Sequence, residues 1–275
     1  MRKVFIHLYS QEAAMRDLIM VLIILILIAL LCVYVHISLT LSSIDTISIE
    51  TEEYLKNKVG PEFDADRFRS YIKSLLEKFD FLSDDNVIFY TPFYARRKNQ
   101  NSLNAHTGLP GQKVIIFTPG WAARLYEESF AQKSDGVVTD FFAFVLGHEV
   151  THKDMRHAPI FIFGKKRVCD SWIREIRSDF GGIRKAGLSP ERVRQCLEKE
   201  VFGREGNRQR RTSTKSMFSS HPTWDYRMQC WDEGSMSAGL IEKICKDCGV
   251  TDKPFCDKMK RLYGEKAART EKMAG

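Results

Sequence analysis

The stretch Phe144-Val-Leu-Gly-His148-Glu149-Val-Thr-His152 joins an apolar run to a His-Glu-x-x-His motif. On a helix, residues four positions apart lie on the same face, so His148 and His152 can bind one metal ion together. Glu149 lies one position further round, where a carboxylate can act as a general base. Because so short a motif also occurs by chance, the rest of the chain has to supply the remainder of a site.

A catalytic zinc site needs a third protein ligand and one open position for water. The extended metzincin motif is excluded, because Met155 and Ala158 occupy the positions of its Gly and third His. His157 is near in sequence, but we interpret it as a surface residue at the end of the helix. A gluzincin takes its third ligand from a Glu on a following helix.

The segment 170–179 contains such a Glu. Glu175 and Asp179 are four positions apart and would share one helix face. Glu175 can then complete the metal site, and Asp179 can accept the outward N–H of a ligating histidine and fix its tautomer. Alternatively, both residues belong to a charged surface face together with Arg174 and Arg177.

An apolar run from Leu18 to Leu39 stands near the start of this chain of 275 residues, a length that fits one large domain or two small ones. At about 1.5 Å per helical residue the run spans the roughly 30 Å hydrocarbon core of a bilayer. A signal peptide has a shorter apolar region, and no small-x-small cleavage site follows here. We therefore predict an uncleaved single-pass transmembrane anchor.

The charges that flank this run predict its orientation. Arg2, Lys3 and Arg16 precede it, whereas residues 42–53 contain acidic residues and no Lys or Arg. Because basic residues favour the cytoplasmic side, we expect a cytoplasmic N-terminus and an extracytoplasmic catalytic domain, periplasmic or equivalent.

The remaining pattern predicts a mainly helical α+β domain with a small β-sheet. Strands are expected at 86–91 and 113–118, and the second should pair in a hairpin with the segment that starts at Asn104. Helices are expected at 50–59, 64–79, 121–132, 137–155, 170–185, 190–200 and 221–228. The helix at 137–155 is apolar nearly all round, so it should be buried at the centre of the domain.

These features divide the chain into five parts. We expect a short cytoplasmic N-terminus (1–17), the anchor (18–39), a juxtamembrane connector (40–62), a zinc metallopeptidase domain (63–230) and a cysteine-containing C-terminal extension (231–275).

Six of the seven cysteines lie outside the anchor: Cys169, Cys196, Cys230, Cys245, Cys248 and Cys256. An even number in an extracytoplasmic domain is consistent with disulfides. We therefore favour two local disulfides in the C-terminal cluster. A structural zinc ion bound by Cys230, Cys245, Cys248 and Cys256 is the alternative.

Much of the net charge of +7 is local to the basic segment 204–215, which carries Arg204, Arg208, Arg210, Arg211 and Lys215. We interpret this segment as a solvated, mobile loop, with a lid or a self-cleavage site as the alternative. It lacks interleaved aromatic residues and any nucleic-acid-binding module, so no nucleic-acid partner is predicted.

Four motifs resemble those of one family. The segment 146–152 resembles the active-site helix of the HtpX-type membrane metallopeptidases, which are related to the CAAX prenyl proteases. The segment 174–179 resembles their Arg-Glu-x-x-Ala-Asp motif, with Ser178 in place of Ala. Asn104-Ala105 with the following Leu-Pro-Gly resembles their Asn-Ala-x-x-x-Pro-Gly segment with one extra residue, and 220–228 resembles their late His-Pro-x-x-x-x-Arg motif.

This resemblance implies a zincin-type (gluzincin) domain in which Glu175 is the third zinc ligand beside His148 and His152. It covers roughly residues 104–227 and leaves out the first hundred residues and the cysteine-rich C-terminus. Members of that family have several membrane spans, whereas this chain has one, so their particular substrates do not carry over.

The expected function is a membrane-anchored zinc endopeptidase acting on a protein or peptide substrate. Glu149 would be the general base toward a zinc-activated water and would then protonate the leaving amine. From the family motif, His221 or Arg227 is expected to stabilise the anionic intermediate. The edge around Asn104 and Ala105 is expected to bind substrate as an added β-strand.

Two other functions remain open at this point. One is a membrane-tethered binding or chaperone-like protein that uses the fold without turnover, although no catalytic residue is missing from the sequence. The other is a structural scaffold with a chance motif, which would bind no stoichiometric zinc.

Overall fold

The computed structural model describes residues 2–42, 46–82, 86–90, 103–107, 113–130, 135–155, 164–202 and 221–264. These residues are mainly helical with one three-stranded sheet, so the predicted α+β class is confirmed. The chain divides into two compact units: the first contains the N-terminal helix, and the second contains nearly all residues from Thr46 onward.

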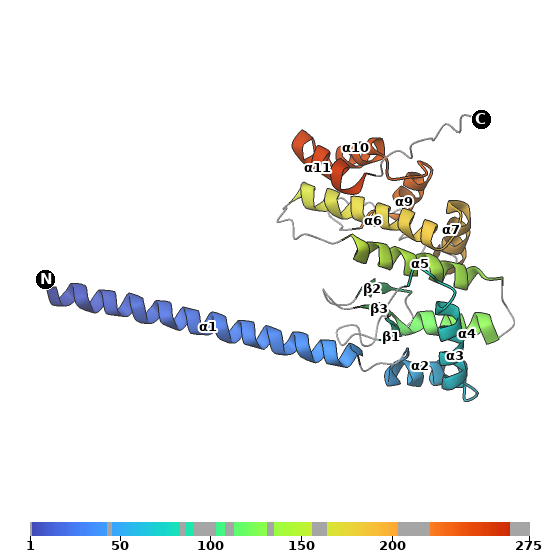
Figure 1. Cartoon of the computed structure of the whole chain (residues 1–275), viewed down its shortest axis with the longest axis horizontal. Helices are drawn as coiled ribbons and strands as arrows, with labels where there is room; N and C mark the ends of the chain where they lie inside the picture. Colours follow the sequence, from blue (N-terminus) through green and yellow to red (C-terminus); the bar gives the residue numbers. More distant parts are fainter. Residues whose placement is uncertain are drawn as a thin grey trace. The chain divides into compact units, whose positions relative to one another are not determined.

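The first unit contains helix α1 (Arg2–Ser42). Its Leu18–Leu39 segment is long and apolar enough to cross a membrane, with a mean hydropathy of 3.5. The large apolar side chains along this segment are exposed. The length and composition of α1 thus fit the predicted anchor (Figure 1), and its orientation stays a prediction.

The sheet of the second unit has the strand order β1 (Asn86–Phe89), β3 (Val114–Phe117) and β2 (Ala105–Thr107). Strand β1 runs parallel to β3, and β2 runs antiparallel to it with Ala105 opposite Phe117. All four residues of β3 are buried, as in a central strand covered on both faces. The predicted antiparallel pairing of the Asn104 segment is confirmed, whereas β1 ends two residues before the predicted limit of 91.

The segment 46–62, which we expected to be a connector, belongs to the second unit. It contains helix α2 (Ile49–Val59), which packs against α4 (Pro119–Phe130). Leu55 of α2 is fully buried, and the Thr51 hydroxyl donates to the carbonyl oxygen of Phe89 at 2.8 Å. Buried Ile47 and Leu55, together with the hydrogen bonds to Phe89, therefore attach a segment whose sequence is largely polar.

Helix α3 (Ala65–Leu76) follows and confirms the predicted amphipathic helix. The Asp64 side chain caps it by accepting from the N–H of Arg67 at 2.9 Å. Phe68, Ile72 and Leu75 are its buried residues, and they join the main apolar core.

Helix α5 (Val137–Asp154) is the centre of the second unit, as its apolar composition predicted. It lies between the sheet and α6 (Lys165–Lys185), as Figure 1 shows. Its buried aromatic residues, Phe141, Phe142 and Phe144, face Trp121 of α4 and neighbouring core residues. This helix carries the His-Glu-x-x-His motif.

The C-terminal helices belong to the second unit and pack on α6. After α7 (Pro190–Leu197) and the π-helical turn η2 (Glu198–Phe202), the described chain resumes with α9 (Trp224–Trp231), α10 (Ala238–Asp247) and α11 (Lys253–Tyr263). A second apolar core fills the space between α6 and these last three helices. The basic segment 204–215 and His157 lie outside the described residues.

Candidate metal centre

Glycines allow α5 and α6 to approach until their backbones touch. A Cβ atom at Gly182 would lie 2.7 Å from the carbonyl oxygen of Phe144 and 3.0 Å from the backbone nitrogen of His148. A Cβ at Gly147 would lie 3.1 Å from the Cα of Gly182. Because no side chain separates the helices here, residues of α6 come within reach of the histidines on α5.

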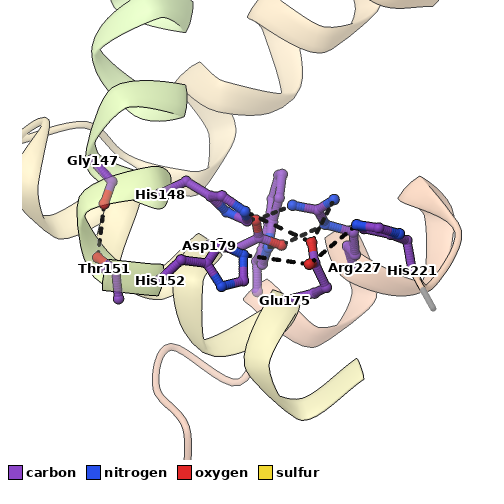
Figure 2. A network of polar contacts seen from close by, with 9 residues as sticks. Gly147, His148, Thr151, His152, Glu175, Asp179, His221 and Arg227 are labelled. Carbon is purple, nitrogen blue, oxygen red and sulfur yellow. Dashed lines mark hydrogen bonds and ion pairs between the residues drawn. The ribbon is translucent and has the colours of Figure 1, made fainter. Parts of the chain in front are cut away.

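A second close contact lies one residue before Gly182. A Cβ at Gly181 would lie 2.1 Å from Oγ1 of Thr151, which is far inside van der Waals contact. The same hydroxyl donates to the carbonyl oxygen of Gly147 at 2.7 Å, as Figure 2 shows. Thr151, one of the variable positions of the motif, thus fixes the crossing of the two helices.

His148, His152 and Glu175 come together as predicted. Their ligand atoms all lie within 4.8 Å of one another, and this group can hold a metal ion. Nε2 of His152 is 3.3 Å from Oε1 of Glu175, and Nε2 of His148 is 3.7 Å from Oε2. Two imidazole nitrogens and a carboxylate oxygen suit several divalent transition metals, zinc among them.

Asp179 lies behind His148, as the sequence predicted, and is completely buried. Its Oδ1 is 3.0 Å from Nδ1 of His148, and its Oδ2 accepts from Nε of Arg227 at 2.7 Å and from Nε1 of Trp231 at 3.1 Å. Nη2 of Arg227 also donates to Oδ1. A carboxylate that receives this many donors is ionised, so Nδ1 of His148 carries the proton and the lone pair of Nε2 faces the site.

The pKa values of the two carboxyl groups agree with this assignment. Burial would raise the pKa of Asp179, but the charge and hydrogen bonds of Arg227 and the hydrogen bond of His148 outweigh it and hold that pKa below its usual range. Burial likewise opposes ionisation of Glu175, and the hydrogen bond of His152 with the charges of Arg227 and His148 hold its pKa well below normal. Both groups are therefore charged, as a metal site requires.

Arg227 is buried, and its guanidinium group contacts the carboxylates of Asp179 and Glu175. Beyond its two bonds to Asp179, its Nη1 is 3.7 Å from Oε2 of Glu175, and its Cζ lies 4.0 Å from the centre of the Trp224 ring. This geometry makes Arg227 a residue that holds Glu175 and Asp179 in place. It does not favour the role of an oxyanion donor that we expected as one of two alternatives.

His221 is on the open side of the same group. Its Nε2 is 3.3 Å from Oε1 of Glu175, and its side chain is 63% exposed. Figure 2 shows Glu175 between His221, Arg227 and the two histidines of α5. An exposed imidazole beside the metal ligands can donate a hydrogen bond to a bound substrate.

Glu149 and the strand β2 lie close to each other beside the metal ligands. Glu149 is half-buried, and it interacts electrostatically with Arg227 and with His106 of β2. Burial lowers the pKa of His106, and the charge of Glu149 raises it in part. The β2 edge of the sheet therefore lies next to the His-Glu-x-x-His motif.

Of the predicted substrate-binding residues, Ala105 is the first residue of strand β2 and Asn104 directly precedes it. Asn104 is exposed, and its carbonyl oxygen accepts from the backbone N–H of Thr118 at 3.0 Å. Strand β2 packs against α5 and, among the described residues, pairs only with β3. An extended peptide can therefore be added along its outer edge.

No family model, curated protein or solved structure matches this chain. The resemblance to the HtpX-type metallopeptidases consequently stays a prediction from the four sequence motifs.

Sequence reasoning missed several residues that build this site. The doublet Gly181-Gly182 was visible in the sequence, but glycines within a helix do not reveal which neighbour they approach. Trp231 gave no signal at all, because its bond to Asp179 joins residues 52 positions apart.

Proposed function

We propose that this chain is a membrane-anchored zinc endopeptidase with a gluzincin-type active site. The observation that carries the proposal is the group formed by His148 and His152 of α5 and Glu175 of α6, whose ligand atoms all lie within 4.8 Å. Its donor set and spacing on two crossing helices agree with the resemblance to HtpX-type metallopeptidases.

The protonation states of the ligand residues already suit the binding of zinc. Asp179 holds the proton on Nδ1 of His148, so that Nε2 is ready to bind, and Glu175 is already ionised. Zinc bound by His148, His152 and Glu175 would supply Lewis-acid activation of the attacking water and of the scissile carbonyl.

Glu149 is the proton carrier in this proposal. It follows His148 directly in α5, so its carboxylate stays beside the metal ligands while remaining half-exposed to a substrate. It takes the proton of the attacking water and delivers it to the nitrogen of the leaving amine. The scissile bond would lie along β2, whose backbone groups bind an extended peptide without reading its side chains closely.

His221 is the donor to the anionic oxygen of the tetrahedral intermediate. Arg227 is held against Asp179 and Glu175, whereas the imidazole of His221 is exposed beside Glu175, where it can reach a bound substrate. A donor directed at developing charge stabilises the transition state more than the ground state.

The experiment compares the full-length chain with its Glu149→Gln variant in detergent, using an unfolded protein as substrate. We expect cleavage to fall by about 10²–10⁴-fold, with zinc content and thermal unfolding unchanged, because only the general base is lost. Glu53→Gln, at an exposed position of α2, is the matched control and should cleave normally.

Removal of the metal tests the same proposal independently. A chelator should abolish cleavage, and added zinc should restore it. Equal cleavage by Glu149→Gln and wild type would show that the motif is not catalytic. Wild-type protein without stoichiometric metal would identify the motif as a chance match.

A further inference from the structure

Two buried thiols meet where α6 packs against α10. Cys169 lies near the start of α6, and Cys245 lies in the last turn of α10. The thiol of Cys169 donates a hydrogen bond to Sγ of Cys245, and the two sulfur atoms are 3.6 Å apart. Both residues belong to the second apolar core and are only 0% and 1% exposed. The contact joins residues 76 positions apart, so it is the fold that brings these two thiols together.

The sequence suggested other partners for the cysteines. All seven are free thiols in the structure, so the two local disulfides that we favoured in the C-terminal cluster are not formed in it. A zinc ion bound by Cys230, Cys245, Cys248 and Cys256 is not supported either, because the group of described side chains that can hold a metal ion is that of His148. The contact of 3.6 Å therefore has to be explained by the chemistry of two thiols.

The distance between the two sulfur atoms is short enough for a disulfide to form between them. A disulfide bond is about 2.05 Å long, so the sulfur atoms have to approach by about 1.5 Å. Rotation about the two Cα–Cβ bonds can supply an approach of this size. Two cysteines that only pack together, as small apolar side chains do, would instead stay unpaired in the presence of an oxidant.

The electrostatic surroundings activate one thiol of the pair. The hydrogen bond from Cys169 is the largest influence on Cys245 and lowers its pKa, and burial opposes this effect. The hydrogen bond of Cys256 and the charge of Lys260 add to the lowering, so that the pKa of Cys245 is about 7. Because the thiolate is the nucleophile in thiol–disulfide exchange, Cys245 is the sulfur that attacks first.

A bond between these sulfur atoms would close a loop that contains part of the metal centre. The loop of residues 169–245 includes Glu175 and Asp179 of α6 and Arg227 of α9. A cross-link over so long a loop removes conformational freedom from the unfolded chain and thereby stabilises the folded one. It would also fasten α10, which follows the helix that carries Arg227, to α6.

We propose that Cys169 and Cys245 form a disulfide that links α6 to α10. The thiolate of Cys245 attacks an oxidant that is itself a disulfide, forms a mixed disulfide with one half of it and releases the other half as a thiol. The sulfur of Cys169 then attacks the sulfur of Cys245 and releases the second half as a thiol. Two electrons and the two thiol protons thus pass from the protein to the oxidant.

The location predicted for this domain suits that reaction. Disulfides form and persist in extracytoplasmic compartments, where disulfide oxidants are present. Because both thiols are buried in the folded chain, the exchange takes place during folding or local opening, and the finished bond is shielded from reductants. The bond does not depend on the peptidase activity proposed above.

Peptide mapping of the full-length chain in detergent tests the bond directly. The protein is incubated with oxidised glutathione below its unfolding midpoint until the thiol pattern is constant, and the remaining thiols are then alkylated. Trypsin separates Cys169 in the peptide 168–174 from Cys245 in 244–246, whereas Cys248 and Cys256 share the peptide 247–258. We expect mass spectrometry without reductant to find 168–174 joined to 244–246.

Thermal unfolding measures the consequence of the bond. The midpoint of the wild type should rise by about 5–15 °C on oxidation. Cys245→Ser should have the same midpoint with and without oxidant, because Cys169 has lost its partner. Cys196→Ser removes another fully buried thiol and is the matched control, which should keep the rise. If Cys245→Ser does not fold, the peptide map of the wild type still decides the matter.

Two results would overturn the proposal. One is complete alkylation of Cys169 after the incubation, which would identify the pair as packed thiols without redox chemistry. The other is a bond from 244–246 to 247–258, which would be a local disulfide of the C-terminal cluster. Neither measurement involves cleavage or metal binding, so a failed disulfide and a failed peptidase proposal are distinguishable.

Discussion

The two halves of the metal centre differ in how they are held. Behind His148, the side chains of Asp179, Arg227 and Trp231 form a closed half: Asp179 is 0% and Arg227 7% exposed. On the other side, His152 is 18% and His221 63% exposed, and Glu149 is half-buried, which together make an open half. One half is built like a protein core, and the other like a binding surface.

This difference separates positioning from chemistry. In the closed half, Asp179 is hydrogen-bonded to His148, Arg227 and Trp231. The orientation of the His148 ring is therefore set before any ligand binds. In the open half, side chains stay accessible to water and substrate, as proton transfer and transition-state stabilisation require. Substitutions in the closed half should therefore change stability and metal affinity, and those of Glu149 and His221 in the open half should change turnover alone.

The largest effect is expected from Asp179→Asn. This change keeps the shape of the side chain but removes a buried charge, so that Arg227 loses its main partner. Breaking a buried ion pair in this way costs about 3–5 kcal/mol of unfolding free energy. Loss of the carboxylate behind His148 should weaken metal binding by about 10–100-fold. Denaturant titration and metal competition measure the two effects.

Asp232→Asn is the control for that measurement. Asp232 also pairs with an arginine, Arg194, but its side chain is 66% exposed. An exposed pair contributes about 0–1 kcal/mol, so this variant should unfold almost like wild type. Equal losses in the two aspartate variants would show that the closed half has no special role.

His221→Ala tests the open half. A lost oxyanion donor lowers kcat by about 10²–10³-fold, which corresponds to about 2.7–4 kcal/mol in the barrier. Because His221 is exposed, the unfolding free energy and the metal affinity should stay unchanged. Steady-state cleavage with parallel metal titration makes the distinction. A fall in metal affinity would instead identify His221 as an additional ligand.

Gly182→Ala probes the helix contact that both halves share. The new methyl group would meet the carbonyl oxygen of Phe144 at 2.7 Å, so α5 and α6 must separate. Such overpacking costs about 1–3 kcal/mol, and the separation should also weaken metal binding because Glu175 moves with α6. Thermal unfolding and metal titration of the same sample test both consequences.

Gly239→Ala in α10 is the matched control. A Cβ there would have only Ser237 Oγ nearby, at 3.8 Å, which is ordinary contact. Alanine is the better helix former by up to about 1 kcal/mol, so this variant should be neutral or more stable. A comparable loss in the two glycine variants would contradict the close-contact argument.

The three metal ligands and Glu149 were easier to predict from the sequence than the closed half. His148, Glu149 and His152 belong to one helix, and Glu175 follows on the next, so local periodicity was enough to find them. The bond of Arg227 to Asp179 joins residues 48 positions apart, and no periodic pattern predicts which buried charges will meet. The family resemblance pointed to Arg227, but it did not give its partner.

The same limit explains the errors in the fold. Helices α3, α5 and α6 show clear amphipathic or apolar patterns and were placed to within a few residues. Residues 46–62 look like a polar connector because only Thr51 and Leu55 of α2 are buried. Burial of so few residues depends on the tertiary partner, here Phe89 and α4, which the local sequence does not contain.

Ser178→Ala should produce the smallest change, and an increase in stability. Ser178 is fully buried between Glu175 and Asp179, and its hydroxyl has no hydrogen-bond partner among the described residues. Replacing it removes an unsatisfied buried polar group and improves helix propensity, for a gain of about 1 kcal/mol. Metal affinity and cleavage should not change, because no contact of the closed half is removed.

Ser74→Ala, at an exposed position of α3, gives the contribution of helix propensity alone, about 0.5 kcal/mol. The difference between the two variants in denaturant titration is then the cost of burying the Ser178 hydroxyl. If Ser178→Ala lowers stability instead, that hydroxyl must bind a group of its own, such as an ordered water. The closed half would then extend from Asp179 along α6 toward Glu175, and the alanine that the family motif has at this position would not be equivalent to the serine of this chain.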